Sequence, residues 1–227
     1  MKQFLFLILF TAAYNGYSQL YSPKGDSTIS QVFIPFEFTS EEDNKLAGED
    51  DSVKYYVASD GKNLVSINEE SSYYKLLTKE HKVITDGPFI AEGDKFLQDG
   101  KWTERFDNGK IKMSGYYHRN NPIGTWREFY SNGKPKAIYN YAIIMDNGET
   151  YTCLSGSYQE FYQTGKLKVN GFYSANAIKV KDTIYVQDPV TLSTVSKVLT
   201  HNIYYPEKTG HWEYYTESGE LDKKDDN

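Results

Sequence analysis

A four-fold repeat in the second half of the chain constrains the fold more than any other feature. Each copy begins with a glycine, carries an aromatic residue two positions later, and has a second glycine seven positions after the aromatic. This internal spacing is identical in every copy, whereas the distances between copies differ, which is typical of one supersecondary unit used repeatedly. The copies are Gly100-Trp102-Gly109, Gly124-Trp126-Gly133, Gly156-Tyr158-Gly165 and Gly210-Trp212-Gly219.

Each copy has the residue pattern of a β-hairpin. In the first copy, large and polar residues alternate over 102–106, a turn follows at 107–110, and the chain returns over 111–117. Asn108-Gly109 and Asn132-Gly133 favour a two-residue turn in which both positions have positive φ. The third and fourth copies carry Thr-Gly and Ser-Gly there, which favours a turn and a bulge with only the glycine left-handed. The leading glycines are expected to end the preceding turn and to admit close packing of the next aromatic.

The repeated aromatics predict an all-β fold, an array of antiparallel β-hairpin repeats that forms an elongated twisted sheet with inserted hairpins. A single hairpin does not bury its own face, so neighbouring hairpins are expected to pair edge to edge. The leading aromatics then form a ladder on one face. Adjacent residues of a strand face opposite sides, so of the two following aromatic sets one points inward and one outward, and the pattern leaves open which. The sets are Phe129, Phe161 and Tyr215, and Phe106, Tyr130 and Tyr162.

An outward aromatic row is a candidate surface for stacking a sugar or a peptide, although aromatic stripes at strand spacing more often serve packing. Two insertions between the copies are further candidates, because insertions at one end of repeat units often form the recognition surface. They cover residues 139–154, with a turn at Asn147, and 178–206, with a turn at Asp188. The same extra strands can instead block aggregation at a sheet edge.

The N-terminus has the pattern of a secretory signal peptide. Lys2 precedes an apolar stretch over 4–13, and Gly16 and Ser18 are the small residues of a cleavage site. We therefore expect residues 1–18 to be removed and the protein to be exported, to the periplasm, the outer surface or the medium. Cys153, the single cysteine, cannot form an internal disulfide, and a small buried hydrophobe is favoured over pairing between chains.

The remainder of the chain divides by pattern. An irregular acidic segment is expected over 19–52, degenerate capping hairpins over 53–98, the repeat array over 99–221, and a disordered tail over 222–227. The formal net charge is −6, and lysine and arginine do not cluster. This balance argues against nucleic acid or an anionic membrane as a partner.

The four copies resemble the MORN-repeat variant family of bacterial proteins, whose motif runs G-x-W-x-x-x-Y/F-x-N-G-K. The resemblance covers roughly residues 99–221. Many bacterial members are grouped under the YwqK-type antitoxin name, which implies neutralisation of a toxin, and other MORN arrays serve as scaffolds or membrane-associated modules. Export and the lack of a separate enzyme domain set this chain apart from that pattern.

No motif for catalysis, a metal or a cofactor is present. The four histidines are dispersed, and the chain has no G-x-S-x-G, H-E-x-x-H, P-loop or C-x-x-C sequence. Glu104, Glu128 and Glu160 recur two residues after the repeat aromatic, whereas the fourth copy has Tyr214 there. A glycosidase needs two carboxylates facing each other across a cleft, so a repeated row is instead interpreted as a solubilising stripe.

Three hypotheses follow from these observations. The first is an exported scaffold that binds protein or glycan through its sheet face and inserted hairpins. The second is an antitoxin or immunity protein that binds one basic toxin with an acidic face. The third is a hydrolase of cell-wall or polysaccharide substrates, which requires convergent carboxylates or histidines in a pocket. The sequence favours the first hypothesis and a protein without enzymatic activity.

Overall fold

The computed structural model describes residues 46–50, 53–58, 60–93, 95–187 and 194–227. Within these residues the chain forms β-strands and no helix, so the described part has no helix long and apolar enough to cross a membrane. The strands are β1 (Leu46–Asp50), β2 (Val53–Val57), β3 (Leu64–Asn68), β4 (Tyr73–Leu77), β5 (Val83–Glu92), β6 (Lys95–Gln98), β7 (Gly100–Arg105), β8 (Ile111–His118), β9 (Asn121–Phe129), β10 (Pro135–Asp146), β11 (Glu149–Phe161), β12 (Leu167–Gln187), β13 (Thr194–Tyr215) and β14 (Leu221–Asp226).

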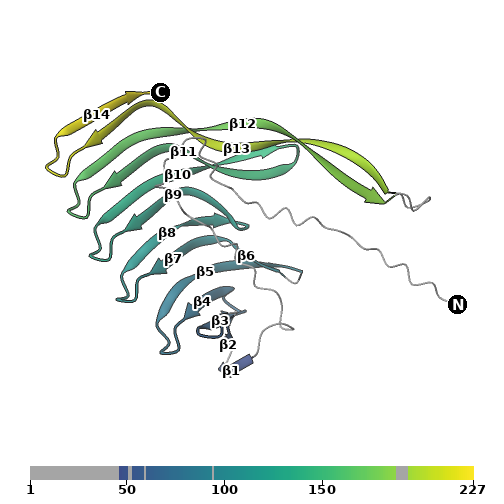
Figure 1. The fold of residues 1–227 in the computed structure, drawn as a ribbon. Coiled ribbons are helices and arrows are strands. Elements are labelled where there is room, and N and C mark those ends of the chain that lie inside the picture. The colour runs from purple at the N-terminus through teal and green to yellow at the C-terminus, as the bar shows by residue number, and fades with distance from the viewer. Residues whose placement is uncertain (1–45, 51–52, 59, 94, 188–193) are drawn as a thin grey trace.

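The strands form one open antiparallel sheet in hairpin order, which confirms the predicted fold class. Each strand pairs with the next along the chain, except that β7 pairs with β5, and β6 pairs with β5 outside this path. Figure 1 shows the hairpins side by side, with regular turns along one edge and longer hairpins projecting from the other. We call these the turn edge and the arm edge.

The end of the chain differs from the prediction of a disordered tail over 222–227. Residues 222–226 belong to β14, which pairs with β13 from His211 to Tyr215, and the backbones of Gly210 and Asn227 are hydrogen-bonded to each other. The consecutive charged residues of β14 therefore form the last strand of the sheet. The other domain boundaries drawn from the sequence remain predictions.

The core is built by aromatic rings that lie on glycines of the preceding hairpin. Trp102 lies over Gly87, Trp126 over Gly115 and Trp212 over Gly171, and a Cβ added to any of these glycines would meet ring atoms at 2.1 to 2.4 Å. The rings are almost fully buried, with 4% of Trp102 and 1% each of Trp126 and Trp212 exposed. A side chain on the glycine would occupy the volume that the next ring fills. Each hairpin thus depends on its neighbour for a large apolar contact.

The third copy satisfies the same contact with different residues. The position of the glycine is taken by Tyr139, and the ring of the next hairpin is Tyr158 instead of a tryptophan. The two rings are stacked, with centroids 6.3 Å apart and an interplanar angle of 27°. Burial and the neighbouring Glu160 raise the pKa of Tyr158 far above its ordinary value, so this phenol stays neutral. The contact between neighbouring hairpins is therefore filled in two ways, by a glycine under a tryptophan or by two stacked tyrosines.

A fifth copy of the unit, at residues 72–83, precedes the four found in the sequence. Its turn has the hydrogen bonds of the others, from Thr78 N to the Lys82 carbonyl at 2.9 Å and from His81 N to the Thr78 carbonyl at 2.9 Å. Ser72 (φ 49°) and His81 (φ 61°) adopt the positive φ of the two repeat glycines. Tyr74 takes the place of the tryptophan and packs on Trp102, with ring centroids 5.5 Å apart.

We expect Gly115→Ala to destabilise the array by about 1–3 kcal/mol, because the added methyl overlaps the ring of Trp126. Urea unfolding measures the effect. The control is Ser114→Ala, one residue away on the opposite face, for which a change within about 0.5 kcal/mol is expected. Equal stability of the two variants would contradict the packing described here.

A second prediction exchanges the two fillings of the repeated site. Tyr139→Gly alone leaves a cavity, and Tyr158→Trp alone overpacks against Tyr139, so both single variants should lose stability. The double variant recreates the glycine–tryptophan pair and should recover about 1–3 kcal/mol relative to the sum of the single changes. A double-mutant cycle of unfolding free energies tests this, and strict additivity would show that the two positions do not share one site.

Candidate functional site

The turns of the turn edge share one backbone geometry. In the first copy Phe106 N donates to the Lys110 carbonyl at 2.9 Å and Gly109 N donates to the Phe106 carbonyl at 2.8 Å, and the turns beginning at Tyr130, Tyr162 and Thr216 repeat both bonds. Gly109 and Gly133 have positive φ, whereas neither Asn108 nor Asn132 does. The predicted two-residue turn in the first two copies is therefore wrong. All copies use the turn-and-bulge form, because asparagine is compatible with either turn and its side chain is engaged elsewhere.

Side chains of each turn reach the backbone of the next turn. Lys110 Nζ donates to the Asn132 carbonyl at 2.9 Å, Lys134 Nζ to Thr164 at 2.5 Å, and Lys166 Nζ to Ser218 at 2.7 Å. The amides of Asn108 and Asn132 donate in the same direction, to the carbonyls of residues 131 and 163, both at 3.1 Å. The last turn carries Glu220 in place of lysine. The N-G-K part of the repeat is thus explained by contacts between hairpins.

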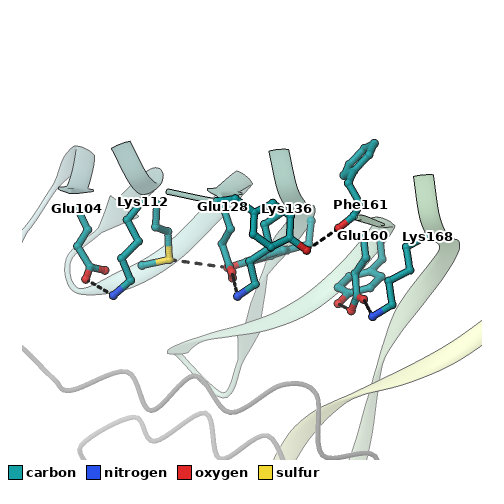
Figure 2. Close-up of polar contacts among 11 residues, drawn as sticks. Glu104, Lys112, Glu128, Lys136, Glu160, Phe161 and Lys168 are labelled. Atoms are coloured by element: carbon teal, nitrogen blue, oxygen red, sulfur yellow. Dashed lines mark hydrogen bonds and ion pairs between the residues drawn. The ribbon is translucent and has the colours of Figure 1, made fainter. Parts of the chain in front are cut away.

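The repeated glutamates pair with lysines of their own hairpins, as Figure 2 shows. The oxygen-to-nitrogen distances are 2.7 Å for Glu104–Lys112, 3.0 Å for Glu128–Lys136 and 3.3 Å for Glu160–Lys168. Only 12% of the Glu128 side chain and 19% of the Glu160 side chain are exposed. The prediction of a solubilising stripe is therefore wrong for these residues. Each carboxylate faces a lysine, which is the arrangement of a structural ion pair rather than of a glycosidase.

The structure separates the two aromatic sets proposed as binding surfaces. Tyr130 and Tyr162 donate from their hydroxyls to the carbonyls of Phe161, at 2.8 Å, and Tyr215, at 2.6 Å, so they brace the next hairpin. Phe106 holds the equivalent place in the first copy. Figure 2 shows Phe161 on the side of the sheet opposite to Glu160 and Lys168. Phe129, Phe161 and Tyr215 therefore form the outward set, half-buried on the face opposite the tryptophans, which we call the back face. A binding role for either set remains a prediction.

Two hairpins extend beyond the array at the arm edge. The short arm (residues 142–153) ends in a two-residue turn in which both Asn147 (φ 51°) and Gly148 (φ 82°) are left-handed. The long arm (residues 176–205) is an unbroken antiparallel ribbon from the Asn176–Tyr205 pair to Gln187–Thr194. Its tip, including Asp188, lies outside the described residues.

The outer half of the short arm contacts the base of the long arm. The rings of Tyr151 in the short arm and Tyr204 in the long arm are 5.3 Å apart, and Asn202 donates to Asp146 at 2.7 Å. Apart from this contact, the arms present large apolar side chains to solvent. Of the twelve exposed large hydrophobics among the described residues, eight belong to the arms: Ile143, Met145, Ile178, Tyr185, Val186, Val195, Val198 and Ile203.

The remaining reactive groups do not converge. His118, His201 and His211 each lie beside one aspartate, respectively Asp99, Asp182 and Asp226. No group of three or more metal-binding side chains occurs in the described ranges. Cys153 is buried, and burial raises the pKa of its thiol to about 11. A thiol in this state is a poor nucleophile.

The turn edge gives a prediction for stability. Lys134→Met removes the hydrogen bond to the Thr164 carbonyl, and because the group is exposed we expect a loss of about 0.5–1 kcal/mol. Glu220→Met changes the equivalent position of the turn at 216–220, after which the described residues contain no further turn, and should leave the unfolding midpoint unchanged. Chemical denaturation of both variants measures the difference. A similar effect at both positions would argue against bonding between turns.

Comparison with known proteins identifies the repeat. The family model described as the MORN repeat variant matches residues 98–119, 122–142 and 154–175. No curated protein and no solved structure matches the chain significantly. The units at 72–83 and 210–221 have the same turn geometry as the matched copies but lie outside the match. The chain therefore carries MORN-type repeats, which are generally binding or scaffold modules and are typically non-catalytic.

Proposed function

We propose that this protein is an exported, non-catalytic binding module of the cell envelope or the extracellular space, in which the repeat array is a rigid support and the arms engage a protein partner. A glycan is the alternative ligand on the outward aromatic row. Export is inferred from the signal-peptide pattern of residues 1–18, which lie outside the described residues.

The concentration of exposed apolar side chains on the arms carries this proposal. Met145 is 69% exposed and Tyr185 is 74% exposed, whereas the aromatic residues at the tryptophan positions of the array are almost fully buried. Exposed apolar groups gathered on one projecting element mark a site of interaction more often than scattered ones do. The turn edge is occupied by hydrogen bonds between hairpins, so the arm edge is the place where side chains remain for a partner.

The absence of enzymatic activity is supported by the arrangement of ionisable groups. The repeated glutamates are paired with lysines, and three of the histidines lie apart beside single aspartates. Catalysis needs a nucleophile, a base and stabilising groups that converge on one point. The typical behaviour of MORN repeats points in the same direction.

A capture experiment tests the proposal. Tagged wild-type protein and the Met145→Lys/Tyr185→Ser variant are incubated with envelope and culture-medium fractions, and bound proteins are quantified by mass spectrometry. We expect the variant to recover about tenfold less of the main partner, because central exposed apolar groups dominate interface energies. The control is Ile111→Ser, which changes an exposed apolar residue on the array (41% exposed) and should leave recovery unchanged.

Equal recovery by wild type and the arm variant would contradict a role for the arms. The antitoxin function is the second candidate, favoured by the acidic net charge of −6, which complements a basic partner. Recovery of one small basic protein in stoichiometric amount would favour it over a scaffold. Recovery of envelope glycans that is lost in Phe161→Ser and not in the arm variant would place the ligand on the outward row.

A further inference from the structure

One face of the long arm is an apolar stripe. Residues paired across the ribbon point to the same side, so the even-numbered residues of β12 share a face with the odd-numbered residues of β13. From base to tip the rows of this face are Ile178/Ile203, Val180/His201, Asp182/Leu199, Ile184/Lys197 and Val186/Val195. Seven of these ten side chains are aliphatic. At the base of the arm the even-numbered residues of β12 belong to the back face, because the odd-numbered Tyr173 packs on Trp212.

This stripe faces away from the short arm. The contacts to the short arm come from Asn202 and Tyr204, which are even-numbered residues of β13 and lie on the opposite face. At the two ends of the stripe, Ile178 is 47% exposed, Ile203 43%, Val186 39% and Val195 45%. A two-stranded ribbon is marginally stable on its own, so a second layer on this face would stabilise it.

We propose that the stripe is a self-association surface, on which the long arm of a second copy of this chain packs face to face with its strands antiparallel. The order of residues argues for a second copy. A two-fold axis between the Asp182/Leu199 and Ile184/Lys197 rows places the row of Asp182 over the row of Lys197 from the other copy, in both directions. The same axis places Val180/His201 over Val186/Val195. Each strand then lies over the same strand of the other copy, so Asp182 of β12 and Lys197 of β13 approach each other diagonally near the centre, with aliphatic groups beside them. Asp182 also lies beside His201 of its own arm, at 3.5 Å. The Ile178/Ile203 row lies outside the four rows that this axis pairs. Such a self-complementary order is what an isologous interface requires.

The size of the stripe sets the expected strength. The stripe covers nine residues of each strand, which span about 30 Å, and two strands are about 10 Å wide. A stable interface buries about 800 Å² on each partner, whereas these dimensions give an area of about 300 Å². The dimer should therefore be concentration-dependent, with a dissociation constant on the order of micromolar.

Analytical ultracentrifugation of the full chain, with any processing that the host performs, tests the inference over a range of concentrations. Wild type is expected to shift from one copy to two copies as concentration rises. Val195→Lys puts a charge into the stripe and should raise the dissociation constant at least about tenfold. The matched control is Val198→Lys on the same strand, a valine that is 60% exposed on the opposite face and whose change should leave the dimer intact.

Charge reversal tests the two-fold arrangement itself. Asp182→Lys and Lys197→Asp should each weaken the dimer, and the double variant should restore it toward wild type. A single-copy mass at all concentrations, or equal effects of Val195→Lys and Val198→Lys, would overturn the inference. The capture experiment is independent of this result, because its variant changes Met145 and Tyr185, which lie outside the stripe.

Discussion

The contact between a ring and the hairpin before it is the constraint on which the rest of this structure depends. A sheet that is one layer thick has no opposing layer to cover its apolar face. The chain solves this by laying Trp102, Trp126 and Trp212 sideways over Gly87, Gly115 and Gly171, so that burial occurs within the layer. Removing a side chain from one strand is what makes room for the largest side chain of the next. Stability therefore resides between neighbours, as in other repeat proteins.

The first and last hairpins of the repeat depart from its residue pattern at the positions that contact a neighbouring hairpin. The turn at 216–220 carries Glu220 where the earlier turns carry the lysine that reaches forward to the next turn. The final strand, β14, consists largely of charged residues, and Asp225 stands where other hairpins have glycine or tyrosine. Charged edge strands discourage the addition of further strands. At the other end, Leu76 and Ile84 replace the glutamate–lysine pair of the later hairpins. The deviations from the repeat thus gather in the first and last hairpins that carry the turn geometry of the repeat.

The hairpin array could be predicted from the sequence because the spacing of glycines and aromatic residues repeats identically in every copy. The sequence was insufficient where one backbone state is open to several residue types. Ser72 and His81 adopt the positive φ for which glycine is expected, so residues 72–83 were predicted only as part of degenerate hairpins and not as a copy of the repeat. Asn108 is compatible with either turn, and only the lysine and asparagine contacts between turns select one. The sequence does contain a signal for this packing. In the four units before the last one, a glycine or tyrosine stands five residues after the turn lysine: Gly87, Gly115, Tyr139 and Gly171. The ion pairs between glutamate and lysine were not predicted, because the bulge beside each turn shifts the register that brings the two side chains together.

The division between the two edges also explains why spacing within a copy is fixed while spacing between copies varies. Lengthening a connection at the turn edge would separate Lys134 from the Thr164 carbonyl and shift the ring off its glycine. Lengthening one at the arm edge adds ribbon beyond the last core residue and leaves those contacts in place. The arms are therefore free to accumulate exposed apolar residues without a cost to the array. Recognition is expected where the chain can change length and surface independently of its core, and in this protein that place is the arm edge.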